Sequence, residues 1–314
     1  MIIPSLVFSL LAAFAMWVFV RRNPAIDPRV TVAILALLLI LPLLNFLPKY
    51  SVLVEGSIGN STSLSPSLLP SIWTLGFLFF GFRALIDVLS MQRWNRESRL
   101  VNDLPVFQET LSELSISRRV DLRIHPRLTS PVVSGLIRPR IYLPENSTDW
   151  SPQTLRMALL HELGHVQRRD LWMATLAHIV CVLHWFNPSV WWLRRTFLSQ
   201  CEYACDAHLV EKGTDPRVYA NALCDVAQSA SAPPLSLAMA GHVPLRERII
   251  FLSSGGRRSS VILSSLILAT ASSAIAMSMV RFVPERAKAQ LLAPIDEVET
   301  VSYTHLRAHE TQSD

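Results

Sequence analysis

The chain of 314 residues is 50% hydrophobic but only 17% charged, whereas soluble proteins carry about 25% charged residues. Its mean hydropathy of +0.33 excludes collagen-like, disulfide-stapled and intrinsically disordered chains, which contain fewer apolar residues. The net charge of +5 is modest, and the basic residues lie beside apolar segments, so we expect no direct binding of nucleic acid.

Apolar segments long enough to cross a bilayer lie at both ends of the chain. Residues 1–20, 30–47 and 68–89 form three near the N-terminus, and residues 261–280 form a fourth. At about 1.5 Å per helical residue, each can cross the roughly 30 Å of hydrocarbon in a membrane. We therefore expect three transmembrane helices within residues 1–90, a fourth at 261–280, and a short outside tail at 281–314.

The loop charges predict the orientation of these helices. The first connection contains Arg21, Arg22 and Arg29, whereas the second, residues 49–67, has one lysine. Because basic loops stay in the cytoplasm, the N-terminus is expected outside and residues 91–260 in the cytoplasm as one domain of ordinary size. All four cysteines lie in that domain, where a reducing compartment would keep them as thiols.

The first part of this domain predicts an α+β fold. Residues 104–114 have apolar side chains at helical spacing, and three short β-branched segments, 120–124, 131–137 and 140–143, suggest a small antiparallel sheet. The strand 140–143 could present an open edge to an extended substrate, with Arg138 and Arg140 steering it. A simple hairpin is the alternative.

A helix follows that carries a metal-binding pattern. Ser151 caps it, Pro152 begins it, and it is expected to continue through 169. His161 and His165 lie one turn apart on one face and can hold a single ion, while Glu162 can take a proton from a water molecule. Zinc suits two imidazoles and a carboxylate. Gly164 is costly in a helix, which predicts a close approach of another element.

The third ligand is expected from the next polar helix. We assign Glu202 as the ligand and Asp206, one turn later, as the acceptor for the distal nitrogen of a ligating histidine. Cys201 and Cys205 could form a thiolate site, although we favour a role as small apolar helix residues. Tyr219 is a candidate oxyanion donor, with simple helix packing as the alternative.

Residues 171–193 are apolar over a membrane-spanning length, yet the histidine pair lies before them and Glu202 lies after them. A full crossing would separate ligands that must lie about 2 Å from one ion. We therefore expect an interfacial or re-entrant hairpin, or packing within the domain, with a bend at Asn187. His178 or His184 could assist the reaction, although we favour a packing role for both.

Several segments together resemble the BlaR/MecR-type regulatory metallopeptidases, bacterial membrane proteins with a cytoplasmic gluzincin domain. They are the leading apolar segments, SGLIRPRIYLP, LRMALLHELGHVQRRD, HWFNPSVWW and CEYACDAHLV, and the resemblance covers about residues 1–280. It implies that zinc is bound by His161, His165 and Glu202, with Glu162 as catalytic base and Asp206 as orienting acid. Asp170 also matches the family pattern, although we favour a role in closing the helix end.

The resemblance implies a multi-pass metalloprotease of the bacterial inner membrane, active in signal transduction as an antirepressor. Its expected partners are the lipid bilayer and a protein substrate, such as a cytoplasmic transcriptional repressor, and a homodimer is an open arrangement. A quality-control or processing zinc protease is the alternative, and a non-catalytic receptor the second alternative. Only 34 residues follow Val280, too few for a sensor domain, and residues 301–311 resemble translated sequencing-adapter sequence.

Overall fold

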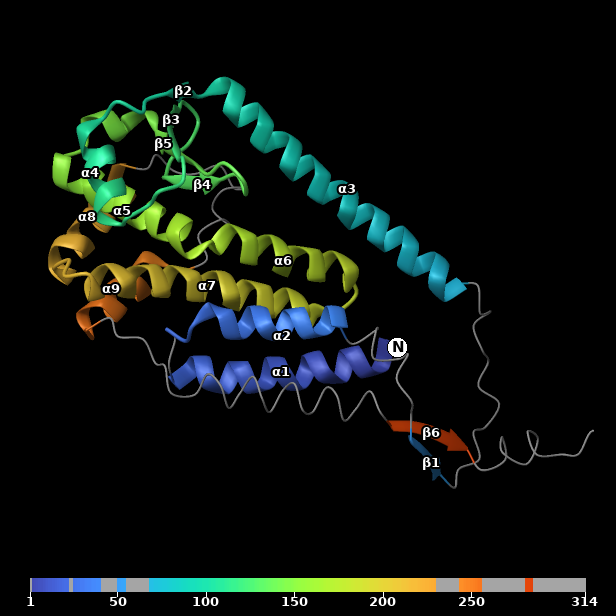
Figure 1. Ribbon diagram of the computed structural model, residues 1–314. Helices are drawn as coiled ribbons and strands as arrows, with labels where there is room; N and C mark the ends of the chain where they lie inside the picture. The colour runs from blue at the N-terminus through green and yellow to red at the C-terminus, as the bar shows by residue number, and fades with distance from the viewer. Residues whose placement is uncertain are drawn as a thin grey trace, which may run out of the picture.

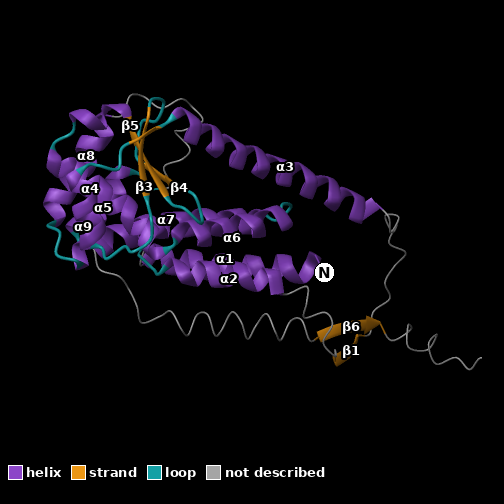
Figure 2. Cartoon of the chain, turned by 45° about the horizontal axis from the view of Figure 1, so that its top comes forward, coloured by secondary structure: helices purple, strands orange, loops and turns teal. Residues whose placement is uncertain are grey.

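Helices dominate the chain, and a four-stranded mixed sheet lies at one end of the molecule (Figures 1 and 2). The computed structural model describes residues 2–22, 25–40, 50–54, 68–229, 243–255 and 280–284. The expected fourth membrane helix at 261–280 lies outside the described residues except for its last one, and the second expected span is described only as far as Ile40.

Four helices pack side by side (Figure 1): α1 (Ile2–Arg22), α2 (Pro28–Ile40), α6 (Asp170–Leu183) and α7 (Pro188–Glu211). Their shared core includes Met16, Leu35, Val180 and Phe197, all fully buried. Helices α6 and α7 form a hairpin because the chain reverses between them, where the side chain of Asn187 accepts a hydrogen bond from the backbone N–H of Ser189. Both ends of the hairpin therefore return to the same side of the molecule.

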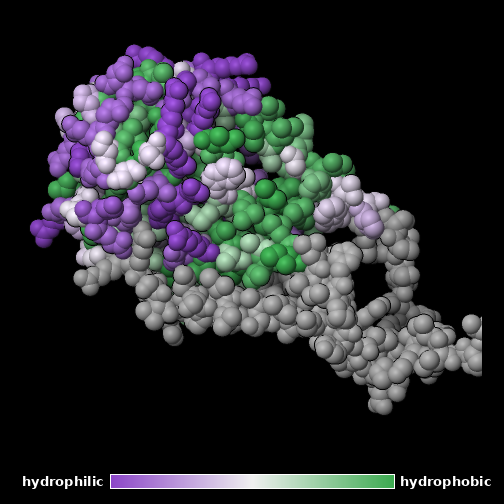
Figure 3. Space-filling view, viewed as in Figure 1, coloured by the Kyte–Doolittle hydropathy of each residue, from purple (hydrophilic) through white to green (hydrophobic). Residues whose placement is uncertain are grey.

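Helix α3 (Leu68–Glu97) has an exposed apolar surface. Among the described residues, it alone is long and apolar enough to cross a membrane: within Pro70–Glu97, an 18-residue window has a mean hydropathy of 1.7. Hydrophobic residues gather over α3 and neighbouring α6, whereas hydrophilic residues cover the end with the sheet (Figure 3). This division of the surface is what a membrane-associated protein requires.

Hydrogen bonds near both ends of α3 hold this helix against the rest of the molecule. Near its start, the indole of Trp185 donates to the backbone oxygen of Trp73, and Trp73 donates to that of Leu183, both at 3.2 Å. Near its end, Arg123 donates to the backbone oxygens of Asn95, at 3.2 Å, and of Ser98, at 3.4 Å. A guanidinium suits this position because the last carbonyls of a helix lack partners and carry negative partial charge.

The sheet has the strand order β2-β3-β5-β4, with strands β2 (Arg99–Leu100), β3 (Asp121–His125), β4 (Val132–Ser134) and β5 (Arg140–Pro144). Strands β3 and β5 are parallel, so the expectation of an antiparallel sheet is wrong. The expectation that residues 140–143 form an open edge is also wrong. After β3 the chain first builds the outer strand β4 and then returns as β5 between the two, which leaves β4 at the edge.

Helix α5 (Pro152–Arg168) packs on this sheet. Leu159, Leu160 and Leu163 on the helix and Leu122 and Ile141 on the strands belong to one core and are at most 1% exposed. Each such side chain stabilises the fold by about 1.5–3 kcal/mol through burial. The remaining elements are α4 (Pro105–Glu113), the 3₁₀ turn η2 (Glu145–Asp149), α8 (Pro216–Ser229), α9 (Leu245–Ser253) and a separate parallel pair, β1 (Tyr50–Val54) with β6 (Val280–Pro284).

Candidate metal centre

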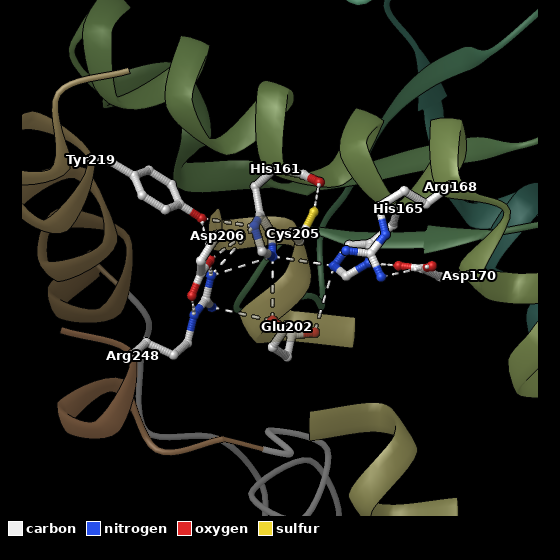
Figure 4. Close-up of polar contacts among 9 residues, drawn as sticks. All are labelled: His161, His165, Arg168, Asp170, Glu202, Cys205, Asp206, Tyr219 and Arg248. Atoms are coloured by element: carbon white, nitrogen blue, oxygen red, sulfur yellow. Dashed lines mark hydrogen bonds and ion pairs between the residues drawn. The ribbon is translucent and has the colours of Figure 1, made fainter. Parts of the chain in front are cut away.

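Helix α5 presents the histidine pair from adjacent turns. The hydroxyl of Ser151 accepts a hydrogen bond from the backbone N–H of Thr154 at 3.0 Å, so the expected cap is confirmed. The Nε2 atoms of His161 and His165 lie 3.2 Å apart (Figure 4). A Cβ atom on Gly164 would lie 2.6 Å from the Sγ atom of Cys205. This confirms the expected close approach of another element, which is α7.

Glu202 on α7 faces both imidazoles. Its Oε2 atom lies 3.3 Å from Nε2 of His161, and its Oε1 atom lies 3.6 Å from Nε2 of His165. Ligand atoms about 2.0–2.2 Å from a tetrahedral zinc ion are separated from one another by about 3.3 Å. The two imidazoles and this carboxylate therefore have the spacing that one zinc ion needs.

Cys205 offers a second possible ligand set, because its Sγ atom and nitrogens of His161 and His165 lie within 4.8 Å of one another. The thiol, however, donates to the backbone oxygen of His161, with 3.1 Å between the two atoms. Burial also raises the pKa of this thiol, which disfavours the thiolate that binds metal. The pKa of Glu202 behaves differently: burial raises it, but the hydrogen bond with His161 and the charge of Arg248 outweigh burial and hold it low. On these contacts, Glu202 is the better-placed candidate for the third ligand.

Asp170 orients His165 from behind. Its Oδ2 atom lies 2.8 Å from Nδ1 of His165, and its Oδ1 atom pairs with Arg168 at 3.3 Å. Burial lowers the pKa of His165, but the hydrogen bond to Asp170 and the charge of Glu202 outweigh burial and raise it to about 9. Asp170 also begins α6, at the helix junction where we expected it. The role in closing the helix end that we favoured does not account for its hydrogen bond with His165.

His161 is oriented through a tyrosine. The hydroxyl of Tyr219 lies 2.8 Å from Nδ1 of His161 and donates to Oδ1 of Asp206 at 2.7 Å. Asp206 itself is 3.5 Å from that nitrogen, so the tyrosine relays the contact that we expected Asp206 to make directly. Tyr219 is fully buried and lies in the lining of the cavity described below, so its role as an oxyanion donor stays a prediction.

Arg248 on α9 was not identified as a site residue from the sequence. Its Nη1 atom lies 3.3 Å from Oε2 of Glu202. Its Nε and Nη2 atoms donate to the two oxygens of Asp206 at 2.9 and 2.5 Å. In the sequence this arginine is one of several basic residues before the last apolar segment, and no local pattern links it to α7.

A cavity of about 470 Å³ opens at the two imidazoles. Glu162 lines it and is 8% exposed; burial raises the pKa of its carboxyl, which suits a general base. One wall consists of residues 128–133, which include the start of the edge strand β4. Four residues considered from the sequence do not line this cavity: Arg138, Arg140, His178 and His184.

Much of the chain matches a known protein family. A family model described as BlaR1 peptidase M56 matches residues 59–252, which include every residue of the site. The chain is 28% identical over 165 residues to the regulatory protein BlaR1 of Bacillus licheniformis, covering 52% of this chain and 27% of that protein. It is 25% identical over 145 residues to the methicillin resistance mecR1 protein of Staphylococcus aureus (strain Mu50), covering 45% and 24%. The matched region thus spans about a quarter of these relatives.

Proposed function

Because the chain belongs to the BlaR1 peptidase M56 family, we propose that it is a membrane-bound zinc endopeptidase that transduces a signal by cleaving a cytoplasmic regulator, such as a transcriptional repressor. The observation that supports the chemistry is the meeting of His161, His165 and Glu202 at 3.2–3.6 Å beside a buried glutamate. The observation that supports signalling is the similarity to two regulatory proteins.

Each residue of the centre has a defined task in this proposal. The two imidazoles and Glu202 would hold a zinc ion, which would supply Lewis-acid polarisation of the peptide carbonyl and of the attacking water. Glu162 takes a proton from that water and delivers it to the leaving nitrogen. Asp170 keeps His165 in the tautomer that leaves Nε2 free for a metal. Tyr219, held by Asp206, does the same for His161.

The substrate is proposed to bind as an extended segment. Val132 and Val133 on β4 line the cavity, and β4 is the edge of its sheet. An unpaired strand edge can accept a peptide as an additional strand through backbone hydrogen bonds. Arg138, exposed in the turn between β4 and β5, is our candidate for steering it, whereas Arg140 lies opposite Ser134 within the sheet.

The membrane arrangement is part of the proposal. The exposed apolar surface of α3 supports one crossing, and we propose that α1, α2 and residues 261–280 supply the others, around a peptidase domain at 91–260. The α6–α7 hairpin returns to the side from which it starts, which supports a re-entrant hairpin with the metal centre at its cytoplasmic end. The basic residues of the first connection support that orientation.

A metal analysis combined with a cleavage assay tests the enzyme activity. We expect the purified full chain to bind one zinc ion and to cleave an unfolded protein substrate. His161→Ala removes a ligand and is expected to lose both zinc and cleavage. Glu162→Gln should keep zinc but lose at least about 100-fold in cleavage rate, because it cannot accept the proton. Equal zinc content in the wild type and His161→Ala, or unchanged cleavage by Glu162→Gln, would refute the proposal.

A further inference from the structure

The guanidinium of Arg248 enters the metal centre from a helix that supplies no proposed ligand. It bridges two carboxylates one turn apart on α7, Glu202 and Asp206 (Figure 4). Its Nη2 atom also donates to the hydroxyl of Tyr219 at 3.1 Å and lies 3.4 Å from both ring nitrogens of His161. Arg248 thus contacts two proposed ligands, His161 on α5 and Glu202 on α7. It also contacts Tyr219 and Asp206, the two residues that orient His161.

The residues that make these contacts are mostly buried. The side chains of Asp206, Arg248 and Glu202 are 0%, 13% and 23% exposed. Two buried carboxylates that share one helix face repel each other unless a cation lies between them. Two nitrogens of the planar guanidinium contact the two oxygens of Asp206, and the third nitrogen faces Glu202. Arg248 therefore balances the charge of both carboxylates and also fixes their orientation.

Helix α9 holds Arg248 in this position through contacts of its own. Glu247 accepts a hydrogen bond from the hydroxyl of Tyr203 at 3.2 Å, and the rings of Phe251 and Tyr203 meet edge to face at 5.1 Å. Phe251 and Tyr203 form a small buried cluster with Ala207 and with Ala25, which lies in the connection between α1 and α2. The position of Arg248 therefore depends on the docking of α9 against α7.

We propose that Arg248 is a positioning residue through which the docking of α9 sets the metal affinity of the site. Docked α9 holds the carboxylate of Glu202 at the two imidazoles, and a displaced α9 releases it. The inference rests on the proposed function only in taking His161, His165 and Glu202 as the ligands. Because α9 lies directly before the apolar segment at 261–280, this contact would link that segment to the metal centre.

Charge and position predict opposite effects for the loss of this arginine. A cation beside a site for a divalent ion repels that ion, so its removal would tighten zinc binding if charge alone mattered. A positioning residue predicts weaker binding, because loss of a group that orients a ligand typically costs 10–100-fold in metal affinity. The sign of the change therefore separates the two roles.

The test measures zinc affinity of the full-length protein by competition with a chromogenic chelator. Arg248→Gln and Arg248→Lys are both expected to bind zinc about 10–100-fold more weakly than the wild type, since lysine keeps the charge but lacks the planar fork. Arg246→Gln, an exposed position on the same helix, is the matched control and should bind as the wild type does. Wild-type affinity in Arg248→Lys, or unchanged or tighter binding in Arg248→Gln, would overturn the proposal.

A second variant tests the role of α9 without altering the site. Phe251→Ala removes the ring that packs on Tyr203 and contacts no proposed ligand, and we expect it to weaken zinc binding in the same direction. Unchanged affinity would show that docking of α9 does not control the site. Melting of the metal-free variants identifies any that fail to fold. These outcomes are independent of the proposed function, which fails instead if the wild type binds no zinc or Glu162→Gln still cleaves.

Discussion

The Sγ atom of Cys205 occupies the space beside Gly164, 2.6 Å from where a Cβ atom of that glycine would be. Helices α5 and α7 can therefore approach closely enough to bring Glu202 within 3.3 Å of His161. A side chain at position 164 would push the two helices apart at the level of the metal centre. The glycine costs helix stability locally but permits the geometry of the site.

Gly164→Ala is expected to destabilise the protein by about 1–3 kcal/mol through overpacking and to weaken zinc binding. Thermal unfolding and chelator competition measure the two effects. Gly81→Ala is the control, because nothing lies within 4 Å of a Cβ at that position. The double variant Gly164→Ala/Cys205→Ala removes the obstructing sulfur and should recover both properties. If the single variant behaves like the wild type, the close approach does not shape the site.

Asp170→Asn tests the orientation of His165. The amide keeps the size of the side chain but removes the charge that favours a proton on Nδ1, so we expect zinc affinity to fall by about 10–100-fold. Asp103→Asn, on an exposed loop, is the matched control. Wild-type zinc affinity in Asp170→Asn would leave Asp170 with only the helix-end role that the sequence suggested.

His125 predicts a pH dependence of stability at the junction of α3 with the sheet. Its side chain is buried, and burial lowers its pKa, while the nearby Glu97 opposes this shift. The unfolded chain therefore takes up this proton first, near pH 6.5, so the stabilisation is complete above that pH and is lost as the pH falls towards the lower folded value. Melting temperatures between pH 7.5 and pH 5 should fall more for the wild type than for His125→Gln. Equal losses would contradict this assignment.

The sequence predicted those features that depend on neighbouring residues. The cap at Ser151 and the close approach at Gly164 are confirmed, since each follows from the local requirements of one helix. The three strand segments also formed, but their order did not follow from alternation. The alternation in a strand shows which of its residues face the core, but it does not show which other strands are its neighbours. The sequence therefore predicted β5 as the edge strand, whereas the edge is β4.

The supporting contacts of the site could not be predicted because they join distant parts of the chain. Tyr219 reaches His161 from α8, and Arg248 reaches Glu202 from α9. Neither residue has a sequence pattern that connects it with the histidine pair. Asp170 did have a signal, its place in the family pattern, but a helix-end role explained the same position equally well. The ligand roles of His161, His165 and Glu202 stay predictions that direct metal analysis must test.

X-ray absorption at the zinc edge of the purified protein tests the central claim most directly, because it separates nitrogen and oxygen ligands from sulfur by distance. With His161, His165 and Glu202 as ligands, we expect only nitrogen and oxygen neighbours, at about 2.0–2.2 Å, and an unchanged spectrum for Cys205→Ala. A sulfur neighbour at about 2.3 Å that disappears in Cys205→Ala would contradict the account, because it would place Cys205, and not Glu202, on the metal.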